Sequence, residues 1–210
     1  QIHDVAVQNL DVTFALDRSG LVGEDGPTHS GNYDIAYLRC IPNMVICTPS
    51  DENETRKLLT TAYLHNGPAS VRYPRGTGPN SNVDKDLKPL KIGEANIINE
   101  GSAEIVILNF GTLLNEANQI SKELKATLVD MRFVKPLDEK LLRKLFKKAK
   151  VFISIEDGSI MGGAGSAVQE FTSKENLNVR SILFGIPDKF IEHASSCLLY
   201  TSPSPRDKRQ

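Results

Sequence analysis

The chain has 210 residues, of which 40% are hydrophobic and 24% charged, and its formal net charge is −1 at pH 7. This composition is typical of a folded globular protein with one large or two small domains. A net charge so close to zero excludes a global field that would attract nucleic acid or a membrane surface, so anion binding must come from individually placed arginines. The sequence contains no apolar run of about 18 residues that would predict a membrane span.

The three cysteines, Cys40, Cys47 and Cys197, match no zinc-binding spacing and do not indicate an oxidising compartment. We expect Cys40 and Cys47 to be small buried side chains. The sequence opens without methionine, and residues 1–6 read as the middle of a helix. We therefore expect the natural start to precede Gln1, so targeting is not judged from this end.

The first part of the chain alternates strand and helix patterns, which favours an α/β unit with a parallel sheet. The pattern predicts strands at 11–17, 44–47 and 69–73, a loop at 18–32 and a helix at 34–40. A second helix is announced by residues 49–52, where Ser50 is expected to cap the free amides, and it is expected to end at Asn66 and Gly67.

Residues 77–91 are rich in proline, glycine and polar side chains, which indicates a linker between two domains. A second α/β unit follows. Its pattern predicts a hairpin of 92–98 with 103–109 turning at 99–101, a helix after Gly111, strands at 127–129, 151–155 and 179–184, and helices at 137–150 and 164–172. Residues 195–210 lack periodicity, so we expect a disordered tail, and their composition resembles a translated cloning or sequencing adaptor.

The loop after the first strand is the strongest candidate site. Parallel sheets place ligands beyond the carboxyl ends of their strands, and this loop carries Arg18, Asp25 and His29 within twelve residues. Histidine exchanges protons near neutral pH, and a neighbouring carboxylate can orient it. From composition alone, a turn-rich surface loop with solvated charges is an equally good reading.

A second candidate is VRYPRG at residues 71–76, which also ends a predicted strand. The planar guanidinium matches phosphate oxygens, so Arg18 and Arg75 could converge on one phosphorylated ligand. Taken singly, each arginine is more readily explained as a surface ion pair.

MGGAGS at residues 161–166 is a glycine-rich turn between a strand and a helix. It lacks the Walker lysine and the dinucleotide spacing, so we favour close packing or a domain contact over a phosphate cradle. Glu156 and Asp157 are placed to cap this loop. Nucleotide binding would require a ribose-binding acid about twenty residues on, and Glu175 keeps that alternative open.

Several segments together resemble the 1-deoxy-D-xylulose-5-phosphate synthases of the transketolase superfamily. They run in family order over residues 1–190: DRSGLVGEDGPTHSGNYD, YLRCIPNMVICTPSDENE, GPASVRYPRG, LNFGT, TLVDMRFVKPLD and MGGAGSAV. GEDGPTH alone is shared with transketolases, whereas its combination with VRYPRG and MRFVKPLD is specific to the family.

The resemblance implies an α/β fold with two transketolase-like units and mostly parallel sheets. These are a partial pyrimidine-binding domain at 1–78, a linker at 79–91 and the transketolase carboxy-terminal domain at 92–194, followed by the tail at 195–210. It also implies dependence on thiamine diphosphate and Mg²⁺, pyruvate and glyceraldehyde 3-phosphate as substrates, and a homodimeric full-length protein. We expect no nucleic-acid or membrane partner and a cytoplasmic location, or a plastid in a plant or alga.

Residue by residue, the resemblance implies that Arg18 and Arg75 hold the phosphate of glyceraldehyde 3-phosphate. His29 matches a histidine near the reactive carbon of the cofactor, and Asp25 an acid that lines the same site. Ser30 occupies a variable position and receives no role.

The Gly-Asp-Gly motif that holds magnesium and diphosphate, and the glutamate that activates the cofactor, are absent from the 210 residues. The main cofactor anchors are expected before Gln1, with no metal ligands in this chain. We therefore expect the 210-residue polypeptide by itself to be inactive.

Three other readings stay open. The chain could be the carboxy-terminal subunit of a split transketolase or the beta subunit of a 2-oxoacid dehydrogenase, although MRFVKPLD and VRYPRG argue against both. It could also be a non-catalytic, partner-binding protein that keeps the fold.

Overall fold

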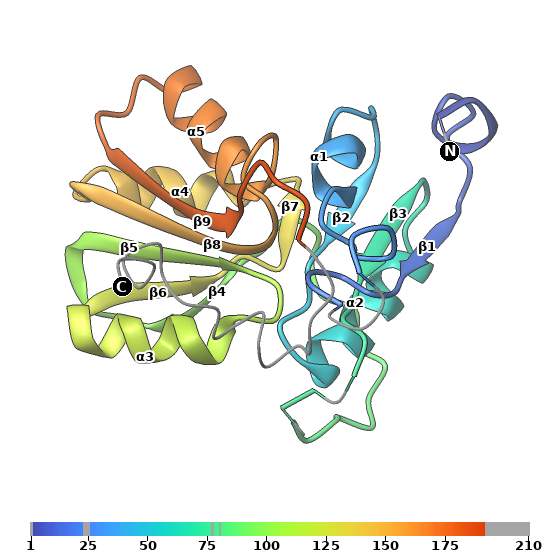
Figure 1. Ribbon diagram of the computed structural model, residues 1–210, viewed down its shortest axis with the longest axis horizontal. Coiled ribbons are helices and arrows are strands. Elements are labelled where there is room, and N and C mark those ends of the chain that lie inside the picture. The colour runs from blue at the N-terminus through green and yellow to red at the C-terminus, as the bar shows by residue number, and fades with distance from the viewer. Residues whose placement is uncertain (1, 23–25, 77, 80, 192–210) are drawn as a thin grey trace, which may run out of the picture.

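The computed structural model describes residues 2–22, 26–76, 78, 79 and 81–191. Two sheets lie side by side, one built mainly from the first third of the chain and one from the rest (Figure 1). The predicted tail, together with Cys197, lies outside the described residues.

The first sheet has the strand order β1-β3-β2-β7. Its strands are β1 (Thr13–Leu16), β2 (Val45–Cys47), β3 (Ala69–Arg72) and β7 (Phe133–Lys135), and its helices are η1 (Ile2–Ala6, a π-helical turn), α1 (Asp34–Arg39) and α2 (Glu52–Tyr63). β1, β3 and β2 are parallel, as predicted, and β7 pairs antiparallel with β2. β7 was not predicted, because three residues are too few to show a period, and it comes from beyond the linker.

The second sheet has the strand order β4-β6-β5-β8-β9. Its strands are β4 (Asn96–Asn99), β5 (Ser102–Phe110), β6 (Ala126–Asp130), β8 (Val151–Ser159) and β9 (Arg180–Ile186), and its helices are α3 (Leu114–Leu124), α4 (Glu139–Phe146) and α5 (Ala164–Lys174). All neighbouring strands are parallel except β4 and β6. The sheet is therefore mostly parallel, as predicted for both units.

The predicted hairpin of 92–98 with 103–109 is wrong. β6 lies between β4 and β5 and pairs with both, so the two strands never meet. The turn instead crosses the end of β6, where a Cβ on Gly101 would lie 2.5 Å from the carbonyl oxygen of Ala126. Two consecutive strand patterns are equally compatible with a hairpin and with two strands separated by a third. Here β6 lies between them, because both of its faces need to be buried.

Both ends of helix α2 differ from the prediction. α2 is capped by Asp51, whose Oδ1 accepts a 2.8 Å hydrogen bond from the Glu54 amide, rather than by Ser50. It ends at Tyr63, before the predicted Asn66 and Gly67, which lie in the connection to β3.

Helix α4 begins at Glu139 because the Asp138 carboxylate caps it, through a 2.9 Å hydrogen bond from the Leu141 amide. It is therefore shorter than the predicted 137–150.

The cysteine prediction is half confirmed. Cys47 is fully buried in β2. Cys40 is exposed at the end of α1, where its Sγ donates to the Tyr37 carbonyl oxygen. Apolar character alone does not show which side of a short helix faces solvent.

One hydrophobic core joins the two sheets. It combines buried side chains of the first unit with buried side chains of the second, among them Ile35, Leu38, Met44, Ile46, Val106, Leu108, Phe110, Met131 and Phe152. A shared apolar core of this kind holds two units in one relative position, unlike a wet and polar domain contact.

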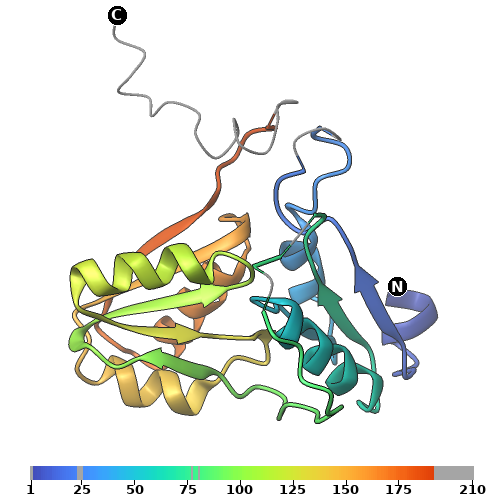
Figure 2. The same ribbon diagram turned by 90° about the horizontal axis from the view of Figure 1, so that it is seen from below.

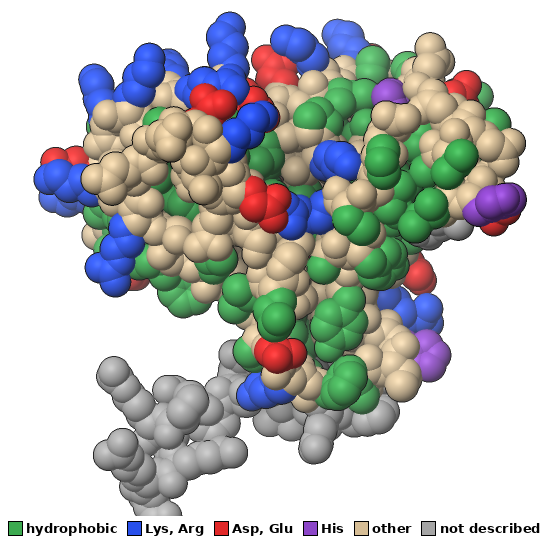
Figure 3. Space-filling model, turned by 90° about the horizontal axis from the view of Figure 1, so that it is seen from above, with side chains coloured by type: hydrophobic (Ala, Val, Ile, Leu, Met, Phe, Trp, Pro, Cys, Tyr) green, Lys and Arg blue, Asp and Glu red, His purple; other side chains and the backbone are tan. Residues whose placement is uncertain are grey.

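The surface mixes charges of both signs with apolar groups, and Lys and Arg side chains gather along one rim of the face in Figure 3. Within the described part of the chain, no helix has the length and apolar character needed to cross a membrane.

Candidate functional site

The carboxyl ends of β1 and β3 lie side by side, since Leu16 pairs with Arg72 in parallel register. The loop that carries Arg18 follows β1, and the YPRG segment follows β3. The two are joined where the Ser19 amide donates a 3.0 Å hydrogen bond to the Tyr73 carbonyl oxygen. Figure 2 shows the described parts of the loop between β1 and α1 extending beyond the sheet edge. The two strand ends therefore lie next to each other, as the sequence predicted for a site at this edge of the sheet.

The loop is closed on itself by backbone hydrogen bonds. The Gly20 amide donates to the Gly31 carbonyl oxygen at 3.0 Å, and the Gly31 amide donates to the Arg18 carbonyl oxygen at 2.7 Å. Ser30, which received no role, bridges the loop, because its Oγ donates to the Gly26 carbonyl oxygen and accepts from the Val22 amide. Arg18 itself has a φ of 61°, a left-handed conformation that is uncommon outside glycine.

His29 is exposed on this loop, with its Nδ1 atom 2.9 Å from the Thr28 hydroxyl. Arg18 is half-buried and lies 3.4 Å from the Asp17 carboxylate. Asp25, the other residue expected to be catalytic, lies outside the described residues.

Arg75 lines a cavity of about 520 Å³ between the two units. The cavity is formed by the segment after β2, the first turn of α2, the segment after β3 and the start of α3, and it carries the acids Asp51, Glu52 and Glu116. Among the described residues that line it, Arg18 and His29 do not appear. The structure thus puts Arg18 and Arg75 on adjoining segments, without joining them around this cavity.

A cluster of buried charged side chains lies beneath the loop. The guanidinium of Arg72, with a side chain only 2% exposed, donates to Asp34 at 2.7 and 3.1 Å and forms a very short contact with Asp157. Its Nη2 also donates to the Gly31 carbonyl oxygen at 2.9 Å. Burial alone would lower the pKa of Arg72, but the charges of Asp157 and Asp34 raise it above its ordinary value.

The sequence motifs favour Arg75, although Arg72 also carries a signal. Arg72 belongs to a predicted strand whose other residues, Ala69, Ser70 and Val71, are all buried. A charged residue in such a strand needs buried partners of opposite charge. Those partners come from α1 and β8, and they are not predictable from the sequence of the strand itself.

The glycine-rich turn before α5 is closely packed and contacts the first unit, as predicted, because the Gly162 carbonyl oxygen accepts a 3.0 Å hydrogen bond from Arg39. Glu156 accepts from the Ala164 and Gly165 amides at 2.8 and 2.9 Å, as the predicted loop cap. Its pKa is raised to about 7, chiefly by burial. A Cβ on Gly163 would lie 2.4 Å from the Glu156 carboxyl group, which therefore already fills the space at these amides.

Two earlier expectations about this turn change. Asp157, also expected to cap it, binds Arg72 instead. Glu175, the acid that kept nucleotide binding open, pairs with Arg143 at 2.7 Å. With the amides at the start of α5 held by Glu156, the structure does not favour a nucleotide there.

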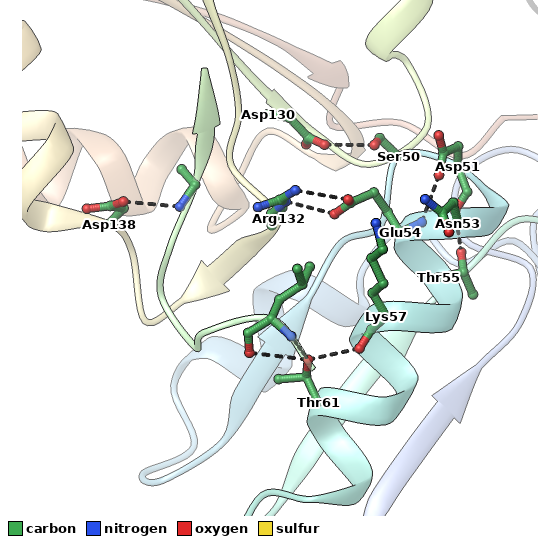
Figure 4. Close-up of polar contacts among 12 residues, drawn as sticks. Ser50, Asp51, Asn53, Glu54, Thr55, Lys57, Thr61, Asp130, Arg132 and Asp138 are labelled. Carbon is green, nitrogen blue, oxygen red and sulfur yellow. Dashed lines mark hydrogen bonds and ion pairs between the residues drawn. The ribbon is translucent and has the colours of Figure 1, made fainter. Parts of the chain in front are cut away.

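Polar contacts on α2 tie the units together beside the cavity (Figure 4). Arg132 forms a bidentate pair with Glu54 at 2.7 and 2.9 Å, with both side chains mostly buried. Ser50 donates a 2.7 Å hydrogen bond to Asp130, whose other oxygen has no partner among the described residues. Burial raises the pKa of Asp130 to about 7.

Within the described residues there is no group of three His, Cys, Asp or Glu side chains that could hold a metal ion.

Comparisons with known proteins agree with the fold. The family described as "Transketolase, pyrimidine binding domain" matches residues 1–80, and "Transketolase, C-terminal domain" matches residues 93–207. A solved structure described as "Split gene transketolase, inactive beta4 tetramer" superposes with a TM-score of 0.81 at 28% identity, over 95% of this chain and 65% of that chain.

Relatives of higher identity carry a more specific name. Proteins of Pseudomonas fluorescens and Pseudomonas paraeruginosa, both named 1-deoxy-D-xylulose-5-phosphate synthase, are 56% and 57% identical to it over 193 residues, or 92% of this chain. The chain spans about a third of their length, 30% and 31% respectively. It therefore belongs to the transketolase family, on the branch of relatives named 1-deoxy-D-xylulose-5-phosphate synthase.

Proposed function

We propose that the full-length protein containing this chain condenses pyruvate with glyceraldehyde 3-phosphate, with loss of carbon dioxide, to give 1-deoxy-D-xylulose 5-phosphate. One observation carries the proposal: relatives of that name share 56–57% identity with 92% of this chain. The 28% identity to a split-gene transketolase is half as high. This difference favours the synthase over transketolase itself.

The cofactor of the full-length protein is proposed to be thiamine diphosphate with Mg²⁺. When bound, it supplies the nucleophile for pyruvate and stabilises the carbanion left by decarboxylation. The match to a pyrimidine-binding domain supports a place for its ring beside this chain. The diphosphate and metal anchors are proposed to lie elsewhere in the full-length protein.

The proposed roles in this chain concern the acceptor and a proton. Arg18 and Arg75 grip the phosphate of glyceraldehyde 3-phosphate, because a guanidinium fork matches phosphate oxygens. His29, exposed on the loop after β1, exchanges a proton with bound substrate, and Asp25 lines the same site. A homodimeric full-length protein is part of the same proposal.

The test compares the chain alone with a joined form. Residues 1–195 are fused behind the missing amino-terminal part of the Pseudomonas aeruginosa relative, which is 57% identical in the shared region. Decarboxylative condensation is assayed with thiamine diphosphate and Mg²⁺. We expect activity only in the joined form.

Arg75→Ala and His29→Ala separate the two roles in that assay. Arg75→Ala should raise the KM for glyceraldehyde 3-phosphate by at least about tenfold, since a charge-assisted contact is lost. His29→Ala should lower kcat by about 100-fold. A well-folded joined protein without activity would leave a non-catalytic, partner-binding role as the better account.

A further inference from the structure

We propose that Asp157 acts through Arg72 as a positioning residue for the loop that carries Arg18 and His29. By this route the second unit sets the preference of the enzyme for a phosphorylated acceptor. The inference rests on the proposed function and extends it to a residue that touches neither substrate nor cofactor.

Asp157 occupies the place where open α/β sheets bind their ligands. The chain runs from β5 to β6 on one side and then to β8 on the other, so the direction of winding changes between β5 and β8. Ligands of such sheets bind beyond the carboxyl ends of the strands at this point. Here Asp157, near the carboxyl end of β8, receives the guanidinium of Arg72 from the first unit.

A short series of contacts leads from Asp157 to Arg18. Arg72 bridges the Asp157 carboxylate and the Gly31 carbonyl oxygen, and the Gly31 amide holds the Arg18 carbonyl oxygen at 2.7 Å. On the other side, Thr112, which follows β5, donates a 3.3 Å hydrogen bond to Asp157. The acid is thus held by the second sheet and, in turn, holds the loop of the first.

The loop is also packed directly on Asp157. A Cβ on Gly20 would lie 3.2 Å from the Asp157 Cβ, and one on Gly31 would lie 2.4 Å from the Arg18 carbonyl oxygen. Arg18 keeps a left-handed backbone, which is strained outside glycine and persists only where its surroundings enforce it. The contacts to Gly20 and Gly31 supply that enforcement on both sides of the loop.

The charge balance identifies the most informative variant. Within the described cluster one guanidinium faces two carboxylates, Asp34 and Asp157. Asp157→Asn leaves a buried pair of one cation and one anion, whereas removal of Arg72 would leave two buried anions without a counter-charge. Asp157→Asn therefore weakens the link to the loop while the remaining pair stays neutral.

The experiment measures kcat/KM of the joined enzyme for D-glyceraldehyde 3-phosphate and for D-glyceraldehyde, which lacks the phosphate. A misplaced Arg18 lowers the ratio of the two values, because only the phosphorylated acceptor loses a contact, whereas a misplaced His29 or a general loss of structure lowers both values together. We expect Asp157→Asn to lower the ratio of the two values by about tenfold. Arg72→Lys, which keeps the charge but cannot make all the guanidinium contacts, should lower the same ratio.

Glu54→Gln is the matched control. It also breaks an ion pair between the two units, with Arg132, but makes no contact with the loop. We expect this variant to lose stability and to keep the acceptor ratio of the unaltered enzyme.

Hydrogen exchange provides a readout that is independent of activity. The amides of Ser19, Gly20 and Gly31 hold the loop closed, and they should exchange faster in Asp157→Asn than in Glu54→Gln. If the joined enzyme without substitutions is inactive, the proposed function is refuted. The hydrogen-exchange comparison still tests whether Asp157 positions the loop. An unchanged acceptor ratio in an active Asp157→Asn enzyme, or unchanged exchange at these amides, overturns the inference.

Discussion

Ser50 and Asp130, which lie 80 residues apart in the sequence, are joined by a buried 2.7 Å hydrogen bond between the two units. Ser50 follows β2 of the first sheet, and Asp130 ends β6 of the second. The bond meets only one oxygen of the carboxylate, and the other is buried without a partner among the described residues. A carboxylate placed in this way favours its protonated form, so the contact between the units should depend on pH.

The first prediction concerns that dependence. The pKa of Asp130 is about 7 in the folded protein against an ordinary 3.8, so the folded state holds this proton more tightly than the unfolded state does. Its contribution to stability is present below about pH 4 and is lost as the pH rises toward 7, by up to ~1.4 kcal/mol per pH unit. Asp130→Asn keeps an acceptor for Ser50 and carries no charge.

Thermal unfolding midpoints of the joined protein at pH 5.5, 6.5 and 7.5 check this prediction. The advantage of Asp130→Asn over the unaltered protein should grow with pH. Asp86→Asn removes an exposed acid as a control. Parallel pH profiles for Asp130→Asn and the unaltered protein would contradict the prediction.

The cap of α2 yields a second prediction. Asp51→Ala removes the acceptor for the Glu54 amide and should cost about 1 kcal/mol, as is usual for a lost helix cap. Ser50→Ala leaves the cap in place but removes the donor to Asp130, so its cost should be greater at pH 8, where that acid is charged. Urea unfolding at pH 5.5 and 8 separates the two, and a cost of Ser50→Ala that does not rise with pH would refute the assignment.

The contribution of an ion pair to the stability of this protein should depend on how deeply the pair is buried. Glu54→Gln leaves Arg132 mostly buried without its charged partner and should cost about 3 kcal/mol. Glu139→Gln breaks a pair with Arg143 in which both side chains are more than 40% exposed, and should cost much less than Glu54→Gln. Denaturant titration of both variants tests the order, and equal costs would show that the contact between the units is not desolvated.

At Gly165 in α5, helix propensity favours alanine whereas the packing of neighbouring side chains favours glycine. Alanine is favoured over glycine inside a helix by about 1 kcal/mol. At this position, however, its Cβ would lie 2.3 Å from Ser154 Oγ and 2.9 Å from Leu183. We expect Gly165→Ala to be destabilising by about 1–3 kcal/mol, because overpacking outweighs propensity.

Ser154→Ala is the matching partner for that variant, because the Ser154 hydroxyl is buried without a hydrogen-bond partner among the described residues. The double variant should recover part of the stability lost in Gly165→Ala. A double-mutant cycle with additive free energies would show that the predicted clash is absent.

The local pattern of the sequence was sufficient for much of the fold. Alternating strand and helix signals placed β1, β2, β3, β8 and β9, and the loop after β1, close to where the structure has them. These elements are fixed by residues near in sequence, since buried parallel strands are apolar runs and the turns that follow them carry glycine. The family was also evident from the combination of motifs.

Strand order and several side-chain contacts depend on segments that are distant in the sequence, so they follow from the tertiary packing and not from the local pattern. β6 separates β4 from β5, and β7 crosses from the second unit to the first sheet, because sheet order follows from burying strand faces and edges. Ser50 faces Asp130 rather than capping its own helix. A residue's type shows which contacts it can make, but its partner is set by the packing of segments that the local pattern does not relate.

The same distinction applies to the candidate site. The sequence by itself determined which loops carry Arg18, His29 and Arg75, since these follow strand ends. Only the tertiary structure showed Arg72 buried between Asp34 and Asp157, because the cost of burying a charge is met by groups from three separate elements.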